Sequence, residues 1–131
     1  MAVLHKILYV EDEPDIQIIA KMSLEVLGGF TVCVCSGGVE ALEQAQEFMP
    51  DLILLDVMMP GMDGPETLKQ LKQLPELALT PFVFMTAKVN AHEIAHYLSL
   101  GAKAVIAKPF EPMELPKKIQ EIFDLHQSLS G

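Results

Sequence analysis

Carboxylates follow two of the apolar runs in this sequence. Asp56 comes directly after residues 52–55, and Glu11 and Asp12 come directly after residues 7–10. A buried charge without a partner is costly, so these acidic residues fit the tips of strands, in a site that uses them. The sequence therefore predicts an acidic pocket at one edge of a sheet.

A hydroxyl and an ammonium group end two later apolar runs. Thr86 follows residues 81–85, and Lys108 follows residues 104–107. Clustered carboxylates repel one another by roughly 4 kcal/mol per close pair at an effective dielectric near 20, and Mg²⁺ relieves this repulsion because it prefers oxygen ligands. Lysine and threonine can hold an anionic group beside the metal. The set fits phosphoryl transfer, with Asp56 as the acceptor.

Each of these residues alone also has a structural interpretation. An aspartate after a strand is commonly a turn residue or a helix cap. A lysine at a strand end is commonly solvated, and threonine is a common strand residue. Only their joint position at one edge of the sheet favours the functional interpretation.

Five short apolar runs must position these side chains. They cover residues 7–10, 31–35, 52–55, 81–85 and 104–107. The runs are mostly continuous rather than alternating in polarity, which is typical of strands covered on both faces of a parallel sheet. The stretches between them have helical periodicity, so we expect a three-layer α/β sandwich with ligands beyond the carboxyl ends of the strands.

The composition limits the possible partners. The 131 residues suit one domain, 1–131, with a core at about 6–125 and a frayed tail after Leu125. The formal net charge is −9, and all nine basic residues are lysine. These features argue against direct nucleic-acid binding, which favours arginine. The sequence contains no recognisable signal peptide or membrane span, so we expect a cytoplasmic protein.

The motifs together resemble the receiver domains of two-component response regulators. The resemblance covers about residues 6–125 and rests on segments 7–14, 54–64, 85–87, 101–102 and 108–110. It implies a doubly wound, flavodoxin-like fold with a five-stranded parallel sheet in the order 2-1-3-4-5 and five helices. It also implies that Asp56 accepts a phosphoryl group from a histidine kinase or a phosphotransfer protein.

The resemblance implies a Mg²⁺ site as well. Asp12 and Asp56 would bind the ion directly, and Glu11 would act through water. The backbone carbonyl of Met58 would be a further ligand, which leaves the Met58 side chain free to vary.

Four other residues would surround the phosphoryl group. Thr86 would hydrogen-bond it and shift inward on activation, and Lys108 would pair with its oxygens. Ala87 is small and would leave the site open. The bond between Lys108 and Pro109 would be cis, a conformation that proline readily permits.

The sequence departs from the receiver pattern at two positions. Many receivers have an aromatic switch residue three positions before the lysine, where this chain has Val105. Pro116 falls about one turn into the last predicted helix, so we expect that helix to start late or to open irregularly. Both lie near the fourth helix, fifth strand and fifth helix, the face on which receivers commonly bind a downstream protein. Because the chain stops after the fifth helix, the expected output is a protein contact or a phosphorelay step.

Residues 92–96 match H-E-x-x-H, a zinc-protease signature. A protease would need a third ligand, for example Glu111, Glu114 or Glu121, and a substrate cleft. Since another architecture explains the rest of the sequence, we expect His92 and His96 on an exposed or partner-facing helix, where they could bind a stray metal ion.

Two alternative functions fit the same layout. A phosphohydrolase of the haloacid dehalogenase class also uses an aspartyl nucleophile, but it usually has a second aspartate where this chain has Met58. A receiver-like adaptor that is never phosphorylated would not need Asp12, Asp56, Thr86 and Lys108 together. The sequence leaves the adaptor open.

Overall fold

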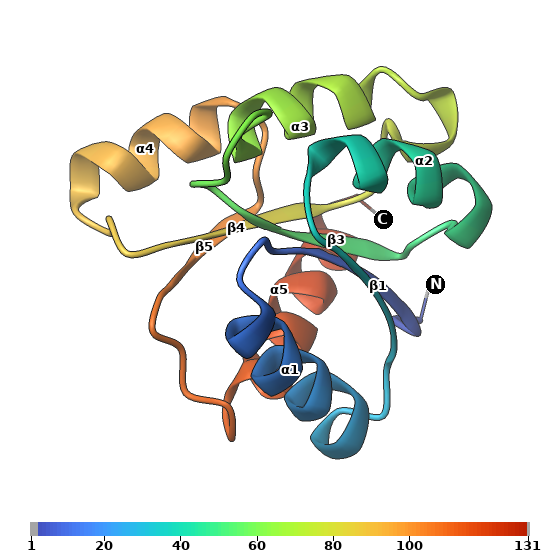
Figure 1. The fold of residues 1–131 in the computed structure, drawn as a ribbon, viewed down its shortest axis with the longest axis vertical. Helices are drawn as coiled ribbons and strands as arrows, with labels where there is room; N and C mark the ends of the chain where they lie inside the picture. Colours follow the sequence, from blue (N-terminus) through green and yellow to red (C-terminus); the bar gives the residue numbers. More distant parts are fainter. Residues whose placement is uncertain (1–2, 131) are drawn as a thin grey trace.

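The computed structural model describes residues 3–130. Its five strands form one parallel sheet in the order β2-β1-β3-β4-β5, with helices on both faces (Figure 1). The strands are β1 (Lys6–Val10), β2 (Thr31–Cys35), β3 (Leu52–Asp56), β4 (Phe82–Thr86) and β5 (Ala104–Ala107). The helices are α1 (Pro14–Met22), α2 (Gly38–Phe48), α3 (Gly64–Lys72), α4 (Ala91–Ser99) and α5 (Leu115–Ser130), with single turns η1 (Ser23–Leu27) and η2 (Pro75–Leu77). The predicted architecture and strand order are confirmed.

The sheet divides the hydrophobic core into two layers. Successive side chains of a strand point to opposite faces, so Leu8 and Val10 pack with α2, α3 and α4, whereas Ile7 and Tyr9 pack with α1 and α5. Every residue of the central strands β3 and β4 is buried. This burial on both faces explains why their apolar runs are continuous.

The register brings the carboxyl ends of the strands to one edge. Val10 lies opposite Leu55, and Asp56 lies opposite Met85. Asp56 and Thr86 are the last residues of their strands, whereas the sequence placed each just beyond the strand. Because they still belong to the ladder, their backbones are fixed by the sheet.

The last helix differs in length from the prediction. It begins at Leu115, so Pro116 is its second residue, where a missing N–H costs nothing; the predicted late start is confirmed. The helix α5 continues to Ser130, past Leu125, after which the sequence predicts a frayed tail. His126 and Gln127 remain half-buried, so this stretch still has contacts that support helix. Residues 1–2 and 131 of the predicted domain lie outside the described residues.

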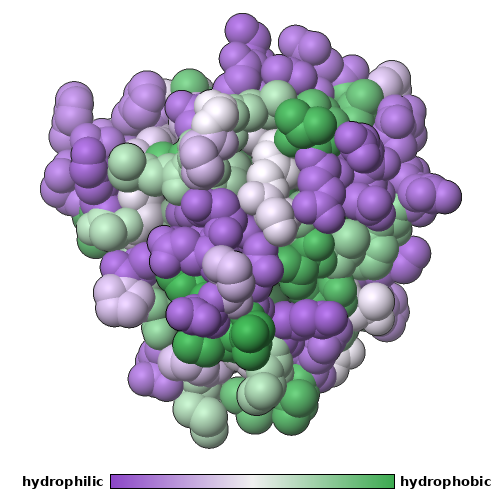
Figure 2. Space-filling view, viewed as in Figure 1, coloured by the Kyte–Doolittle hydropathy of each residue, from purple (hydrophilic) through white to green (hydrophobic). Residues whose placement is uncertain are grey.

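One part of the surface is apolar. Large hydrophobic side chains of α1 and η1 are exposed, and Figure 2 shows hydrophobic groups over the lower part of the molecule, where Figure 1 places α1. They include Ile18, Met22 and Val26, and they line a groove of about 300 Å³ together with Met113. None of the helices described here is both long and apolar enough to cross a membrane.

Candidate functional site: an acidic cluster with a lysine

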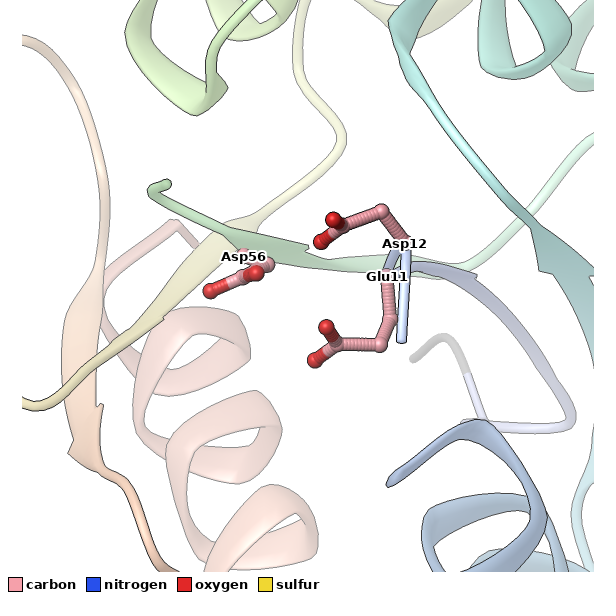
Figure 3. Close-up of side chains that lie close together, drawn as sticks. All are labelled: Glu11, Asp12 and Asp56. Atoms are coloured by element: carbon pink, nitrogen blue, oxygen red, sulfur yellow. The ribbon is translucent and has the colours of Figure 1, made fainter. Parts of the chain in front are cut away.

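Three carboxylates meet at the carboxyl ends of β1 and β3 (Figure 3). One oxygen each of Glu11, Asp12 and Asp56 can be chosen so that all lie within 4.8 Å of one another. Glu11 and Asp56 are buried, and Asp12 is half-buried. The sequence-predicted acidic pocket is therefore formed by these three residues.

The loop after β3 ends directly beside Asp56, where α3 begins. Asp63 accepts a hydrogen bond from the backbone N–H of Glu66 at 3.0 Å and so caps α3. Gly64 lies against the backbone of Asp56, where a Cβ atom would come within 2.5 Å of the Asp56 carbonyl oxygen. Only glycine permits this close approach, so the start of α3 is fixed directly beside Asp56.

Lys108 connects the acidic residues. Its Nζ lies 2.9 Å from Oε1 of Glu11 and 3.3 Å from Oδ1 of Asp56. The Tyr9 hydroxyl donates a hydrogen bond of 3.2 Å to Glu11 Oε1, and the backbone N–H of Glu13 donates one of 3.3 Å to Oε2. These donors explain how Glu11 can remain fully buried.

Asp12 is held differently. Within residues 3–130, its Oδ1 is buried and has no hydrogen-bond partner. A buried carboxylate oxygen without a donor, facing two more carboxylates, is the environment that a hard divalent cation relieves. The donor set therefore fits Mg²⁺, with oxygen ligands from Asp12 and Asp56 and with Glu11 close enough to act through water.

Burial and charge shift the pKa values in the cluster. The pKa of Asp56 is raised to about 6, mainly by burial and then by the charge of Glu11, although the charge and hydrogen bond of Lys108 partly offset this rise. For Lys108, burial lowers the pKa, but its hydrogen bond to Glu11 and the charges of both carboxylates outweigh this and raise it overall. Lys108 therefore remains an ammonium ion at neutral pH.

The remaining predicted residues lie at or just after the carboxyl ends of β3, β4 and β5. Thr86 is buried, and its Oγ1 accepts a hydrogen bond from the Lys88 N–H at 3.1 Å. Ala87 is exposed, and the peptide bond before Pro109 is cis, as the resemblance implies. The Met58 side chain is 66% exposed.

The altered switch position lies in the core. Val105 is half-buried and packs in the layer of α2, α3 and α4. In the same layer, the ring of Tyr97 lies 5.3 Å from that of Phe84. The helix α4 thus supplies an aromatic side chain that packs against Phe84 of β4.

Sequence reasoning missed the part played by Tyr9. It was assigned only to an apolar run, yet its hydroxyl holds Glu11. The signal was present, because residues two apart in a strand lie on the same face, so a tyrosine two positions before a buried acid can donate to it.

The zinc-protease arrangement is not formed. Among residues 3–130, Glu11, Asp12 and Asp56 are the only group of three candidate metal ligands. His92 and His96 are exposed on α4, with no third ligand gathered around them.

Residues 7–120 match the family model of the response regulator receiver domain. The chain belongs to this family. The receiver is 40% identical over 117 residues to the alkaline phosphatase synthesis transcriptional regulatory protein PhoP of Bacillus subtilis, an alignment covering 89% of this chain and 48% of that protein. It is 37% identical to the phosphate regulon transcriptional regulatory protein PhoB of Rhizobium meliloti, covering 89% of this chain and 51% of that protein. The receiver spans about half the length of these curated relatives.

Solved structures show the same fold. The chemotaxis protein CheY4 of Vibrio cholerae is 30% identical, with a TM-score of 0.85 over 92% of this chain and 99% of that one. A CheY-like receiver domain protein from Methanospirillum hungatei is 28% identical, with a TM-score of 0.82 over 96% of this chain and 98% of that one. Receiver domains are signalling domains of two-component systems, and this chain has their architecture.

Proposed function

We propose that this receiver accepts a phosphoryl group on Asp56 from a histidine kinase or a phosphotransfer protein and thereby switches a protein-binding face. The observation that carries the proposal is the meeting of Asp56 with Asp12 and Lys108 at one sheet edge. An acceptor oxygen, a candidate cation site and an ammonium group are the parts that phosphoryl transfer requires.

The metal site has named ligands in this proposal. Asp12 and Asp56 would hold Mg²⁺ directly, the backbone carbonyl of Met58 would be a further ligand, and Glu11 would act through water. When bound, the ion supplies positive charge that reduces repulsion between the carboxylates and an incoming phosphoryl group. The unpartnered Oδ1 of Asp12 supports this assignment.

The transfer is a displacement at phosphorus. A carboxylate oxygen of Asp56 forms a bond to phosphorus while the P–N bond of the donor phosphohistidine breaks, and that electron pair remains on the imidazole nitrogen. Lys108 pairs with the phosphoryl oxygens, and Thr86 donates a hydrogen bond to one of them. The small Ala87 leaves room for the group. The product is an aspartyl phosphate.

In this proposal, a movement of Thr86 at the end of β4 changes the protein-binding face. Thr86 leaves its present environment to reach the phosphoryl group, which biases the packing of α4, β5 and α5 between two states. A downstream protein binds this face in one state. We place this activity in a single cytoplasmic receiver unit, with a core at residues 6–125, that does not itself bind nucleic acid.

The phosphohydrolase alternative is weaker at one position. Met58 stands where that class usually has a second carboxylate, and its thioether cannot transfer a proton. The adaptor alternative gives no reason for the Oδ1 atom of Asp12, which has no hydrogen-bond partner within residues 3–130, to lie beside Asp56.

Hydrogen exchange tests the switch. Phosphorylation with a small acyl phosphate and Mg²⁺ is expected to change amide protection at residues 86–88 and along α4 and β5. An Asp56→Asn variant treated identically is the control and should show no change. Equal exchange in the phosphorylated and unphosphorylated protein would contradict the switch. The remaining function would then be to carry the phosphoryl group in a relay step.

A further inference from the structure

The fourth helix holds two histidines that the proposed function does not use. The Asn90 side chain caps α4 by accepting a hydrogen bond of 2.9 Å from the N–H of Glu93. Tyr97 anchors the side of α4 that faces the sheet, because its side chain is only 5% exposed and packs against Phe84. The helix is thus fixed at its start and along its inner side. Its orientation on the sheet is therefore defined.

His92 and His96 lie on the outer side of this helix. They are four residues apart, which places them about 6 Å apart along the axis and about 40° apart around it. Both are exposed, so the fold does not depend on either. The His96 ring lies 5.6 Å from that of Tyr97, at 52° to it. The two imidazoles therefore share one helix face, with one ring beside an anchored aromatic.

Two imidazoles on one helical turn offer nitrogen ligands to a single ion. Imidazole suits Zn²⁺, Ni²⁺ and Cu²⁺, whereas Mg²⁺ prefers oxygen. We propose that His92 and His96 form a surface chelate for a divalent transition-metal ion, separate from the acidic cluster at the sheet edge. The chelate does not rest on the proposed phosphoryl transfer.

The site provides two protein ligands and remains open. Glu93 lies on the adjacent part of the helix, but its charge acts on the buried Tyr97, whose pKa is raised by burial and by Glu93. No group of three ligands forms around the histidines within the described residues. Water or a carboxylate from another molecule completes the coordination. This open coordination distinguishes the site from a structural zinc site, which has four protein ligands.

Bound metal would cross-link one turn of α4. Because the ion binds the folded helix better than the unfolded chain, it stabilises α4 by mass action. His96 and Glu93 also line a groove of about 690 Å³ between α4 and the loop after β3. An ion on His96 therefore changes the charge at the edge of this groove, which reaches Met58.

Calorimetric titration with ZnCl₂ in the presence of excess Mg²⁺ tests the chelate. The full chain is expected to bind one equivalent of Zn²⁺. His92→Gln and His96→Gln should each weaken binding by roughly tenfold or more, a loss of about 1.4 kcal/mol. His5→Gln is the matched control, since His5 is also exposed but lies far from α4 along the chain. The Zn²⁺ affinity of this variant should stay within about twofold of that of the parent protein. Equal affinity in all variants, or no Zn²⁺ binding at millimolar concentrations, would overturn the proposal.

Fluorescence provides an independent local readout. The chain has two tyrosines and no tryptophan. Cu²⁺ bound at His96 should quench the neighbouring Tyr97, and Tyr97→Phe identifies which tyrosine responds. The double variant His92→Gln/His96→Gln should lose this quenching while keeping its circular dichroism spectrum, because both positions are exposed. Quenching that persists in the folded double variant contradicts the site.

Discussion

The ammonium group of Lys108 lies 2.9 Å from Oε1 of Glu11, a side chain that is fully buried. The two residues are 97 positions apart in the chain, so this contact joins the end of β1 to the loop after β5. Glu11 has other donors, but Lys108 supplies its only salt bridge within the described residues. The same lysine also reaches Asp56, so its charge serves both the fold and the candidate site.

Removing this charge is expected to destabilise the fold. Lys108→Met leaves a buried carboxylate without its counter-ion, so the free energy of unfolding should fall by about 3 kcal/mol. Urea denaturation at pH 7 measures the change. Lys103→Met is the control, because Lys103 is exposed, and it should change stability by no more than about 0.5 kcal/mol. Equal effects of the two substitutions would show that the contact with Glu11 does not stabilise the protein.

Asp12 controls metal affinity if the acidic cluster is a Mg²⁺ site. Asp12→Asn removes a direct ligand charge, so Mg²⁺ affinity should fall by roughly tenfold or more, or about 1.4 kcal/mol. The shift in melting temperature caused by Mg²⁺ should shrink in parallel. Asp15→Asn is the control, since Asp15 is exposed three residues further on. If Mg²⁺ affinity and the Mg²⁺-induced shift in melting temperature are unchanged in Asp12→Asn, Asp12 is not a ligand of the ion.

The raised pKa of Asp56 predicts a pH-dependent stability without metal. Burial raises this pKa to about 6, above an unfolded value of about 3.9, so the folded state binds the proton more tightly. The resulting stabilisation is fully present below about pH 4 and is lost as the pH rises through about 6. Relative to Asp56→Asn, the free energy of unfolding should fall by about 2 kcal/mol between pH 4 and pH 7.

Denaturant midpoints over this pH range, with and without Mg²⁺, measure the effect. Mg²⁺ should abolish most of the fall, because a bound cation favours the ionised carboxylate. Parallel pH profiles for the parent and Asp56→Asn would mean that the Asp56 pKa is not raised by folding.

The Met58 side chain is expected to set the lifetime of the phosphoryl group. This side chain is exposed. Met58 and Val57 line the same groove, and Val57 directly follows Asp56. We predict that Met58 hinders the attacking water, so Met58→Asn should lose phosphate roughly tenfold faster, a change of about 1.4 kcal/mol in the barrier. Phosphate release after removal of the donor measures this rate. Met113→Asn, at another exposed methionine, serves as control, and identical rates in all three proteins would refute the role of Met58.

Much of the fold could be predicted from the sequence, because its signals are local. Continuous apolar runs indicate strands buried on both faces. Gly28 follows the last residue of η1 and Pro65 lies in the first turn of α3, where glycine and proline are common. Once the strands are parallel, their carboxyl ends must share an edge. The gathering of Glu11, Asp12 and Asp56 therefore follows from the order of the elements.

The contacts within the site depend on side-chain orientation and could not be predicted in this way. No pattern in the sequence distinguishes a solvated Lys108 from one shared between two carboxylates. The extent of α5 likewise depends on contacts of His126 and Gln127, which local periodicity does not reveal. The exposure of His92 and His96 was expected, but only the packing of Tyr97 shows which side of α4 faces solvent.

Intact mass of the protein after incubation with a small acyl phosphate, with and without Mg²⁺, tests the proposed phosphoryl transfer most directly. We predict the addition of one phosphoryl group that requires Mg²⁺ and is absent from Asp56→Asn. The absence of an adduct, with a donor shown to be active on another receiver, would contradict phosphorylation by this route and favour the adaptor. An adduct of equal yield in Asp56→Asn would show that another residue is the acceptor.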